Sequence, residues 1–145
     1  MSLNDLQKQG RLRSHRTSRE EIGSLIAIVE RDLKDAAVLI SPDRRFATAY
    51  NAALQLATIV LYCQGYRTRG GGHHATTFAA LQETPLAELS AYSVYFDSCR
   101  SKRNTMDYDR AGEITETETE ELLQEASAFY RVVKAWLQAH HPGLL

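Results

Sequence analysis

The fold of this protein is decided by residues 41–65, which read SPDRRFATAYNAALQLATIVLYCQG. Ser41 and Pro42 predict a helix start, because serine caps a helix and proline is favoured at the first helical position. Apolar residues then cover almost the whole circumference as far as Gln64, and Gly65 suits a left-handed helix end. A helix that is apolar on all sides belongs in the middle of a bundle or in a subunit interface.

Further helices are predicted on both sides of this segment. Ser18 and Glu21 have the spacing of a capping box, and apolar residues after them recur every three or four positions. Near the C-terminus, Thr115 and Thr117 offer helix caps, each with a glutamate three residues later. The expected helices cover residues 19–40, 42–64, 73–81, 85 to between 100 and 107, and 115 or 117 to 139. With no strand alternation and with residues 66–72 read as a loop, the pattern predicts an all-α protein: an antiparallel up-and-down four-helix bundle with a short additional helix.

Length and composition limit the class of protein. A chain of 145 residues fits one domain, which we divide into a basic N-terminal arm (1–17) and a helical bundle (18–141). The net charge of −1 gives no case for general nucleic-acid binding, although it leaves room for local basic patches. Cys63 and Cys99 lie in apolar helical patterns and lack zinc or disulfide spacing. We expect a cytoplasmic protein without membrane association, because no apolar run is long enough to span a bilayer.

The segment with the most chemistry is RSKRNTMDY, residues 100–108. Its arginines and lysine suit phosphate oxygens. Asp107 offers a proton acceptor, and Tyr108 offers a stacking surface or a hydrogen-bond donor. From spacing alone, the favoured interpretation is plainer: Arg103 and Asp107 form an i, i+4 ion pair on a solvated helix face.

A second polar segment is RTRGGGHHATT, residues 67–77. Its glycines allow a close backbone approach, and the helix start that follows attracts anions. The segment is not a P-loop, because it lacks the Gly-Lys-Ser/Thr ending and follows no strand. His73 and His74 point about 100° apart on a helix, so they do not form a metal-binding face. We expect no metal and no cofactor, and the alternative interpretation is a plain loop with its histidines at a helix cap.

Taken in order, several segments resemble a bacterial and archaeal branch of the HEPN superfamily, related to the HEPN toxins that pair with minimal nucleotidyltransferases. The resemblance runs from about residue 6 to residue 137. The segments that carry it are RFATAYNAA (45–53), GYRTR (65–69), the histidine pair (73–74) and RNTMDY (103–108), followed by a helix with an acidic start.

This resemblance implies an up-and-down bundle that is commonly a homodimer, often a metal-independent endoribonuclease. The family motif is an arginine, a polar residue, and a histidine four to six residues beyond the arginine. Arg103 matches the arginine and Asn104 the polar residue, but the histidine position holds Tyr108. Tyrosine has a pKa of ~10 and is a poor substitute for histidine in proton transfer near neutral pH.

Three hypotheses follow, ranked in this order. The first is a homodimeric module that binds RNA or nucleotide phosphate, or docks a nucleotidyltransferase partner, within a toxin–antitoxin-like system. The second is an endoribonuclease toxin with a degenerate Arg-x4-Tyr motif, in which a histidine of residues 70–74 is an alternative proton-transfer group. The third is a structural bundle without a ligand. The candidate catalytic residues are Arg103, Asp107 and Tyr108; the candidate phosphate-binding residues are Arg67, Arg69, His73, Arg100, Lys102, Arg103 and Asn104.

Overall fold

The computed structural model describes residues 1–38, 41–108 and 114–145, and gives only the backbone for residues 105–108. The helices are α1 (Leu3–Lys8), α2 (Arg19–Val38), α3 (Pro42–Cys63), α4 (His73–Gln82), α5 (Ala87–Ser90), α6 (Ser93–Tyr108) and α7 (Glu116–His140), followed by the 3-10 turn η1 (Pro142–Leu144). Two short strands, β1 (Leu12–Ser14) and β2 (Tyr66–Thr68), complete the elements. The all-α fold class is confirmed.

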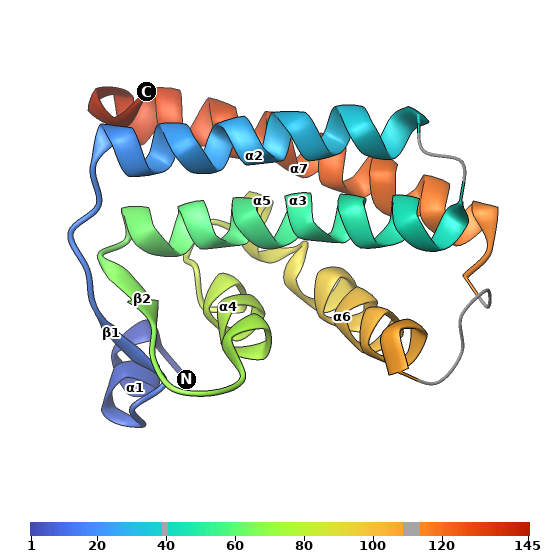
Figure 1. Ribbon diagram of the computed structural model, residues 1–145. Helices are drawn as coiled ribbons and strands as arrows, with labels where there is room; N and C mark the ends of the chain where they lie inside the picture. Colours follow the sequence, from blue (N-terminus) through green and yellow to red (C-terminus); the bar gives the residue numbers. More distant parts are fainter. Residues whose placement is uncertain (39–40, 109–113) are drawn as a thin grey trace.

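The central element is α3, as its apolar composition predicts. Figure 1 shows α2 and α7 along one side of α3, with α4 and α6 on the other side. Apolar side chains of α3 from Phe46 to Leu61 are buried around its circumference. By length and composition α3 is apolar enough to cross a membrane, but most of its apolar window is buried inside the protein, as in the core helix of a bundle.

An aromatic cluster fixes α4 and α6 against the rest of the bundle. Phe96 of α6 is fully buried, and its ring centre lies 6.2 Å from that of Phe78 on α4 and 5.3 Å from that of Phe129 on α7. Tyr92 stacks on Phe96 with ring centres 5.7 Å apart. These contacts set the position of α6, and with it the polar segment that begins at Arg100.

The helix that we expected to begin at residue 85 is interrupted. It is divided into α5 and α6, with Ala91 and Tyr92 between them. At the start of α6 the hydroxyl of Ser93 donates to the carbonyl of Ser90 at 2.8 Å. Serine hydroxyls compete with helical backbone bonds in this way. Leu89 of α5 and Phe96 of α6 are both buried in the core.

A small antiparallel sheet replaces part of the expected loop. Leu12 pairs with Thr68 and Ser14 with Tyr66, so β1 from the N-terminal segment lies beside β2. Next to the sheet, Leu6 and Leu12 are buried against Leu61 and Ala80. Three-residue strands are too short to show an alternating pattern, which is why the sequence did not reveal them.

The predicted caps are confirmed at α7 and in part at α2. The hydroxyl of Thr115 accepts from the backbone N–H of Glu118, whose carboxylate accepts in return from that of Thr115. Ser18 accepts from the backbone N–H of Glu21, but the Glu21 carboxylate contacts His15 at 2.6 Å and Thr17 at 2.8 Å. The glutamate of this second cap therefore holds the N-terminal segment.

Candidate functional site

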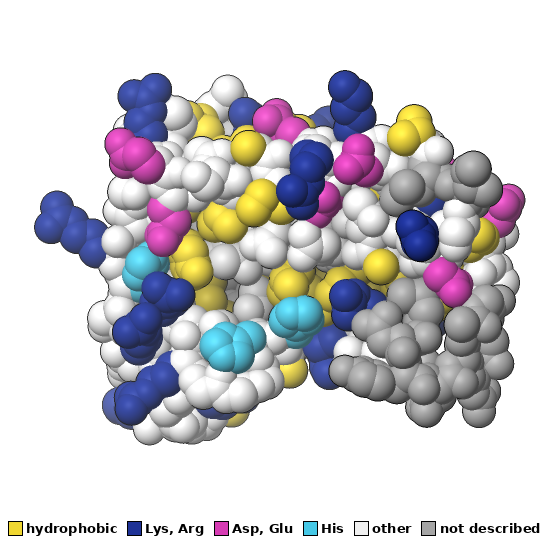
Figure 2. Space-filling view, viewed as in Figure 1, with side chains coloured by type: hydrophobic (Ala, Val, Ile, Leu, Met, Phe, Trp, Pro, Cys, Tyr) yellow, Lys and Arg dark blue, Asp and Glu magenta, His cyan; other side chains and the backbone are white. Residues whose placement is uncertain are grey.

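A shallow cleft of about 460 Å³ lies between the start of α4 and the middle of α6. Figure 2 shows histidine and basic side chains gathered on this face of the molecule, over α4 and α6. Gly72, just before α4, has a left-handed backbone (φ 70°), which glycine adopts at no steric cost. The lining residues are Gly72, His73, His74, Ala75, Arg100 and Asn104.

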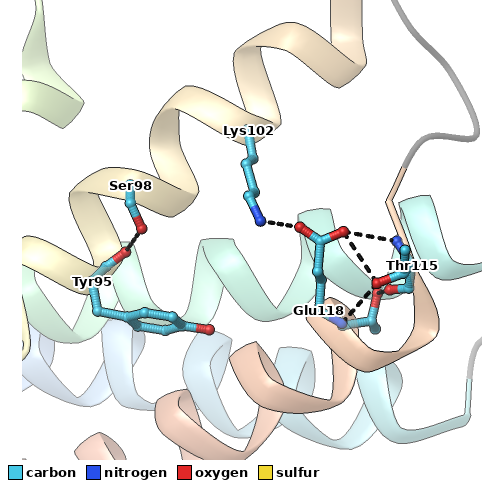
Figure 3. Close-up of polar contacts among 6 residues, drawn as sticks. Tyr95, Ser98, Lys102, Thr115 and Glu118 are labelled. Atoms are coloured by element: carbon cyan, nitrogen blue, oxygen red, sulfur yellow. Dashed lines mark hydrogen bonds and ion pairs between the residues drawn. The ribbon is translucent and has the colours of Figure 1, made fainter.

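Helical spacing explains why Arg100 and Asn104 of α6 line this cleft together, with Arg103 beside them. Arg100, Arg103 and Asn104 are three and four residues apart and therefore share one helix face. Lys102 is two residues from Arg100, about 200° around the helix. Its ammonium pairs with Glu118 at the start of α7, as Figure 3 shows. The structure therefore places Lys102 against α7 and not at the cleft.

His74 is tied to the core by a buried tyrosine. The hydroxyl of Tyr50 on α3 lies 3.0 Å from Nδ1 of His74, and the side chain of Tyr50 is almost fully buried. Burial raises the pKa of Tyr50, so the hydroxyl keeps its proton. Because His74 is its one hydrogen-bond partner among the described residues, we assign the hydroxyl as the donor to Nδ1. The remaining proton of the neutral imidazole is then on Nε2, which leaves an N–H donor for another group.

The cleft carries positive charge from α6. The Arg103 guanidinium lies over the Tyr50 ring, 5.6 Å from its centre, and Arg100 donates to Asp97 at 2.8 Å. Burial lowers the pKa of His74, and the charges of Arg103, Arg100 and His73 lower it further. His74 is therefore neutral at pH 7 and donates a hydrogen bond without adding charge.

The other predicted site residues lie around this cleft or away from it. Arg67 of β2 lies over the Tyr62 ring at 5.8 Å and lines a neighbouring depression. Arg69 is exposed, and its backbone N–H donates to the carbonyl of Arg11, just before β1. The His73 ring hydrogen-bonds the Thr68 hydroxyl at 2.7 Å. The side chains of Asp107 and Tyr108 lie outside the described residues.

His74 is the residue that sequence reasoning did not single out. It was a candidate only as one histidine of residues 70–74, because no spacing in the sequence relates it to Tyr50 or to α6. Among the described residues, no group of three histidine, cysteine or acidic side chains is placed to hold a metal ion.

Comparison with protein families identifies the domain that contains this cleft. Residues 36–134 match the model of the HEPN_SAV_6107-like HEPN family. The chain belongs to this HEPN family. The match covers more than half of the chain, and the resemblance seen in the sequence is confirmed at the level of the superfamily. No curated protein and no solved structure gave a significant match.

The matched region of the HEPN domain contains the whole candidate site. Tyr50, His74 and the α6 arginines all lie within residues 36–134, whereas α1, β1 and most of α2 lie before this region. The cleft therefore belongs to the part of the chain that the family model covers.

Proposed function

We propose that this HEPN domain is a binding module for phosphate groups of RNA or of a nucleotide, and that it binds them in the α4–α6 cleft. The observation that carries the proposal is the convergence of Arg100 and Asn104 from α6 and His74 from α4 on one open cleft, with the Arg103 guanidinium over the nearby Tyr50 ring. Guanidinium groups form strong, charge-assisted hydrogen bonds with phosphate oxygens. Asn104 and the Nε2–H of His74 add neutral donors at the same place.

The state of His74 supports binding over catalysis. A general base in RNA cleavage needs a lone pair directed at the ribose 2′-OH. With the Tyr50 hydroxyl donating to Nδ1, the free nitrogen of the neutral ring carries a proton and acts as a donor. Such an imidazole suits a phosphate oxygen better than it suits a 2′-OH.

A metal-independent endoribonuclease is the second candidate, favoured by one observation. His74 brings an imidazole to the arginines of α6, where the segment Arg103–Tyr108 has none. In this reading the imidazole proton moves to Nδ1, and Tyr50 accepts from it. Nε2 then takes the proton of a 2′-OH, the 2′-oxygen bonds to the adjacent phosphorus, and the 5′-oxygen leaves with a proton from water.

The proposal includes two associations that the sequence resemblance implies. One is a homodimer, and the other is a minimal nucleotidyltransferase as the partner of a toxin–antitoxin-like pair. Light scattering of the purified protein measures its mass in solution and so tests for the homodimer. Two experiments test the nucleotidyltransferase partner. The protein should co-purify with the product of an adjacent nucleotidyltransferase gene, and that gene should relieve growth arrest.

The decisive experiment is a titration of labelled single-stranded RNA in EDTA, followed by fluorescence anisotropy. Arg103→Ala and His74→Ala are compared with wild type and with Arg131→Ala, a matched control on the exposed side of α7. We expect salt-dependent binding that Arg103→Ala and His74→Ala weaken and that Arg131→Ala leaves unchanged.

The same samples are run on a gel to detect cleavage. Cleavage in EDTA that both cleft variants abolish would replace the binding module by the ribonuclease. Absence of RNA binding by folded wild-type protein, or equal loss in all three variants, would contradict both readings of the cleft.

A further inference from the structure

The N-terminal arm, residues 1–17, packs on the bundle beside α4. Figure 1 shows α1, β1 and β2 together at one end of the molecule, next to α4. Leu6 and Leu12 of the arm are buried against Leu61 of α3 and Ala80 of α4, and these four side chains form a cluster apart from the main core. Regions with few buried apolar contacts open more readily than a main core does. The arm can therefore open while the rest of the bundle stays folded.

Backbone hydrogen bonds from the arm hold β2 at both of its ends. The N–H of His15 donates to the carbonyl of Gly65 at 2.8 Å, just before β2. Just after β2, the N–H of Arg69 donates to the carbonyl of Arg11 at 2.9 Å. Among the described residues, β1 is the only strand that pairs with β2. A pair of strands as short as these is marginally stable, so β2 keeps its conformation only while the arm stays in place.

Three glycines, residues 70–72, join β2 to α4. The space beside all three Cα atoms is open, so the segment packs against little. Gly70 and Gly72 have left-handed backbones, with φ of 79° and 70°. Gly72 is also the N-cap of α4, and glycine has no side chain that could cap the helix. The start of α4 therefore has little local support.

The first turn of α4 is held by polar contacts, because the first buried apolar side chain of this helix is Phe78, in the second turn. Among the described residues, three side-chain hydrogen bonds tie the first turn to other elements: Thr68 with His73 (2.7 Å), Arg11 with Thr76 (3.4 Å) and Tyr50 with His74 (3.0 Å). The first comes from β2 and the second from the arm itself. The position of this turn therefore depends on the arm.

Two contacts at Glu21 fasten the arm to α2. The Glu21 carboxylate lies 2.6 Å from Nε2 of His15 and accepts from the Thr17 hydroxyl at 2.8 Å. The His15 ring also lies 4.6 Å from the Tyr62 ring of α3, between centres. Burial acts to raise the pKa of Glu21, but the hydrogen bonds from His15 and Thr17 outweigh it and lower the pKa below its ordinary value. The charged carboxylate is thus stabilised by the contacts that hold the arm.

From these observations we propose that the N-terminal arm is a strap that controls the histidine side of the α4–α6 cleft, with Glu21 as its latch. When the latch releases, the arm separates from β2, the first turn of α4 unwinds from residues 70–72, and His74 leaves Tyr50. The closed form presents His74 beside the α6 arginines, and the open form withdraws it. The inference goes beyond the proposed function, because it concerns the shape of the cleft and not its ligand. The arm precedes residues 36–134, which the family model matches, so the strap is an addition to the matched part of the HEPN domain.

Hydrogen exchange followed by NMR tests this coupling at three backbone N–H groups. Those of His15 and Arg69 report the pairing of the arm with β2, and that of Thr76, which donates to the carbonyl of Gly72, reports the first turn of α4. If one opening exposes all three, Glu21→Ala should speed their exchange by one common factor. We expect about tenfold, for the loss of two partly exposed hydrogen bonds to a carboxylate.

The controls separate the strap from the rest of the bundle. The N–H of Thr119, in the first turn of α7, should exchange as in wild type. Glu20→Ala removes the same charge from the same turn of α2, at an exposed side chain, and should keep all rates within about twofold of wild type. Leu12→Ala disrupts the apolar cluster of the arm and leaves the latch intact. It should speed the same three groups and still spare Thr119.

Three results would overturn the proposal. Faster exchange at His15 and Arg69 with an unchanged rate at Thr76 would mean that the arm opens without affecting α4. Equal acceleration at Thr119 would mean that the arm has no opening of its own and that the whole bundle unfolds together. Equal rates in Glu21→Ala and Glu20→Ala would mean that Glu21 is not the latch.

Discussion

The Tyr50 hydroxyl and Nδ1 of His74 lie 3.0 Å apart, although 24 residues separate them in the chain. The same Tyr50 ring lies beneath the Arg103 guanidinium. One buried phenol on α3 thus contacts a group from α4 and a group from α6. Because Tyr50 is held in the core by α3, it fixes the distance between the two sides of the cleft.

Removal of the Tyr50 hydroxyl should raise the pKa of His74. A hydroxyl that donates to Nδ1 stabilises the neutral ring, so Tyr50→Phe removes one of the effects that oppose protonation. Burial and the α6 arginines still act in the variant. NMR titration of the His74 ring protons measures the change. Tyr130→Phe, which loses a hydroxyl contact to Glu30 between α2 and α7, is the control and should leave the pKa of His74 unchanged. An unchanged pKa in Tyr50→Phe would contradict the assigned tautomer.

The free energy of unfolding should fall as the solution is acidified below pH 7. Burial lowers the pKa values of His74 and His141 from 6.5, so the unfolded chain takes up these protons first. The contribution of these two neutral rings to the free energy of unfolding is therefore fully present above pH 6.5. It declines as the pH falls toward the folded-state pKa values. Thermal unfolding between pH 8 and pH 5.5 measures this slope. His74→Gln should flatten it, and a melting temperature that rises on acidification would show the shift to have the opposite sign.

Phe96 should be among the most costly side chains to truncate. It is fully buried and contacts aromatic rings from α4 and α7. Phe96→Ala should lower the free energy of unfolding by about 3–5 kcal/mol, the range for large cavities in cores. Val94→Ala on the same helix, at a side chain that is 70% exposed, should cost less than about 0.5 kcal/mol. Urea unfolding compares the two, and similar costs would mean that α6 is not anchored through Phe96.

The contact between Lys102 and Glu118 should contribute little stability and no RNA affinity. Both side chains are partly exposed, and exposed ion pairs are worth about 0.2–1 kcal/mol. Thr115→Ala, which removes the α7 cap drawn in Figure 3, should cost more, about 0.5–2 kcal/mol. In the RNA titration Lys102→Ala should match wild type. A loss as large as that of Arg103→Ala would instead make Lys102 a phosphate ligand, as its sequence context suggested.

The sequence alone determined the helices α2, α3, α4 and α7, because their signals are local, but it did not predict α1. Apolar spacing placed α2, α3, α4 and α7 to within a few residues, and the pair Thr115 and Glu118 marked the start of α7. It did not reveal β1 and β2, which are stable only because they pair across more than fifty residues of chain. It also joined α5 and α6, since Leu89 and Phe96 are seven residues apart and would share one face of a continuous helix, so their spacing does not mark the break.

In the candidate site, too, the sequence shows some relationships and the tertiary structure alone shows others. The shared helix face of Arg100, Arg103 and Asn104 follows from their spacing, which the sequence contains. Only the tertiary structure brought His74 and Tyr50 to that face and turned Lys102 toward Glu118. Spacing along a helix is a property of a few neighbouring residues, whereas a contact between helices depends on how the whole core packs, and no short segment of the chain encodes it.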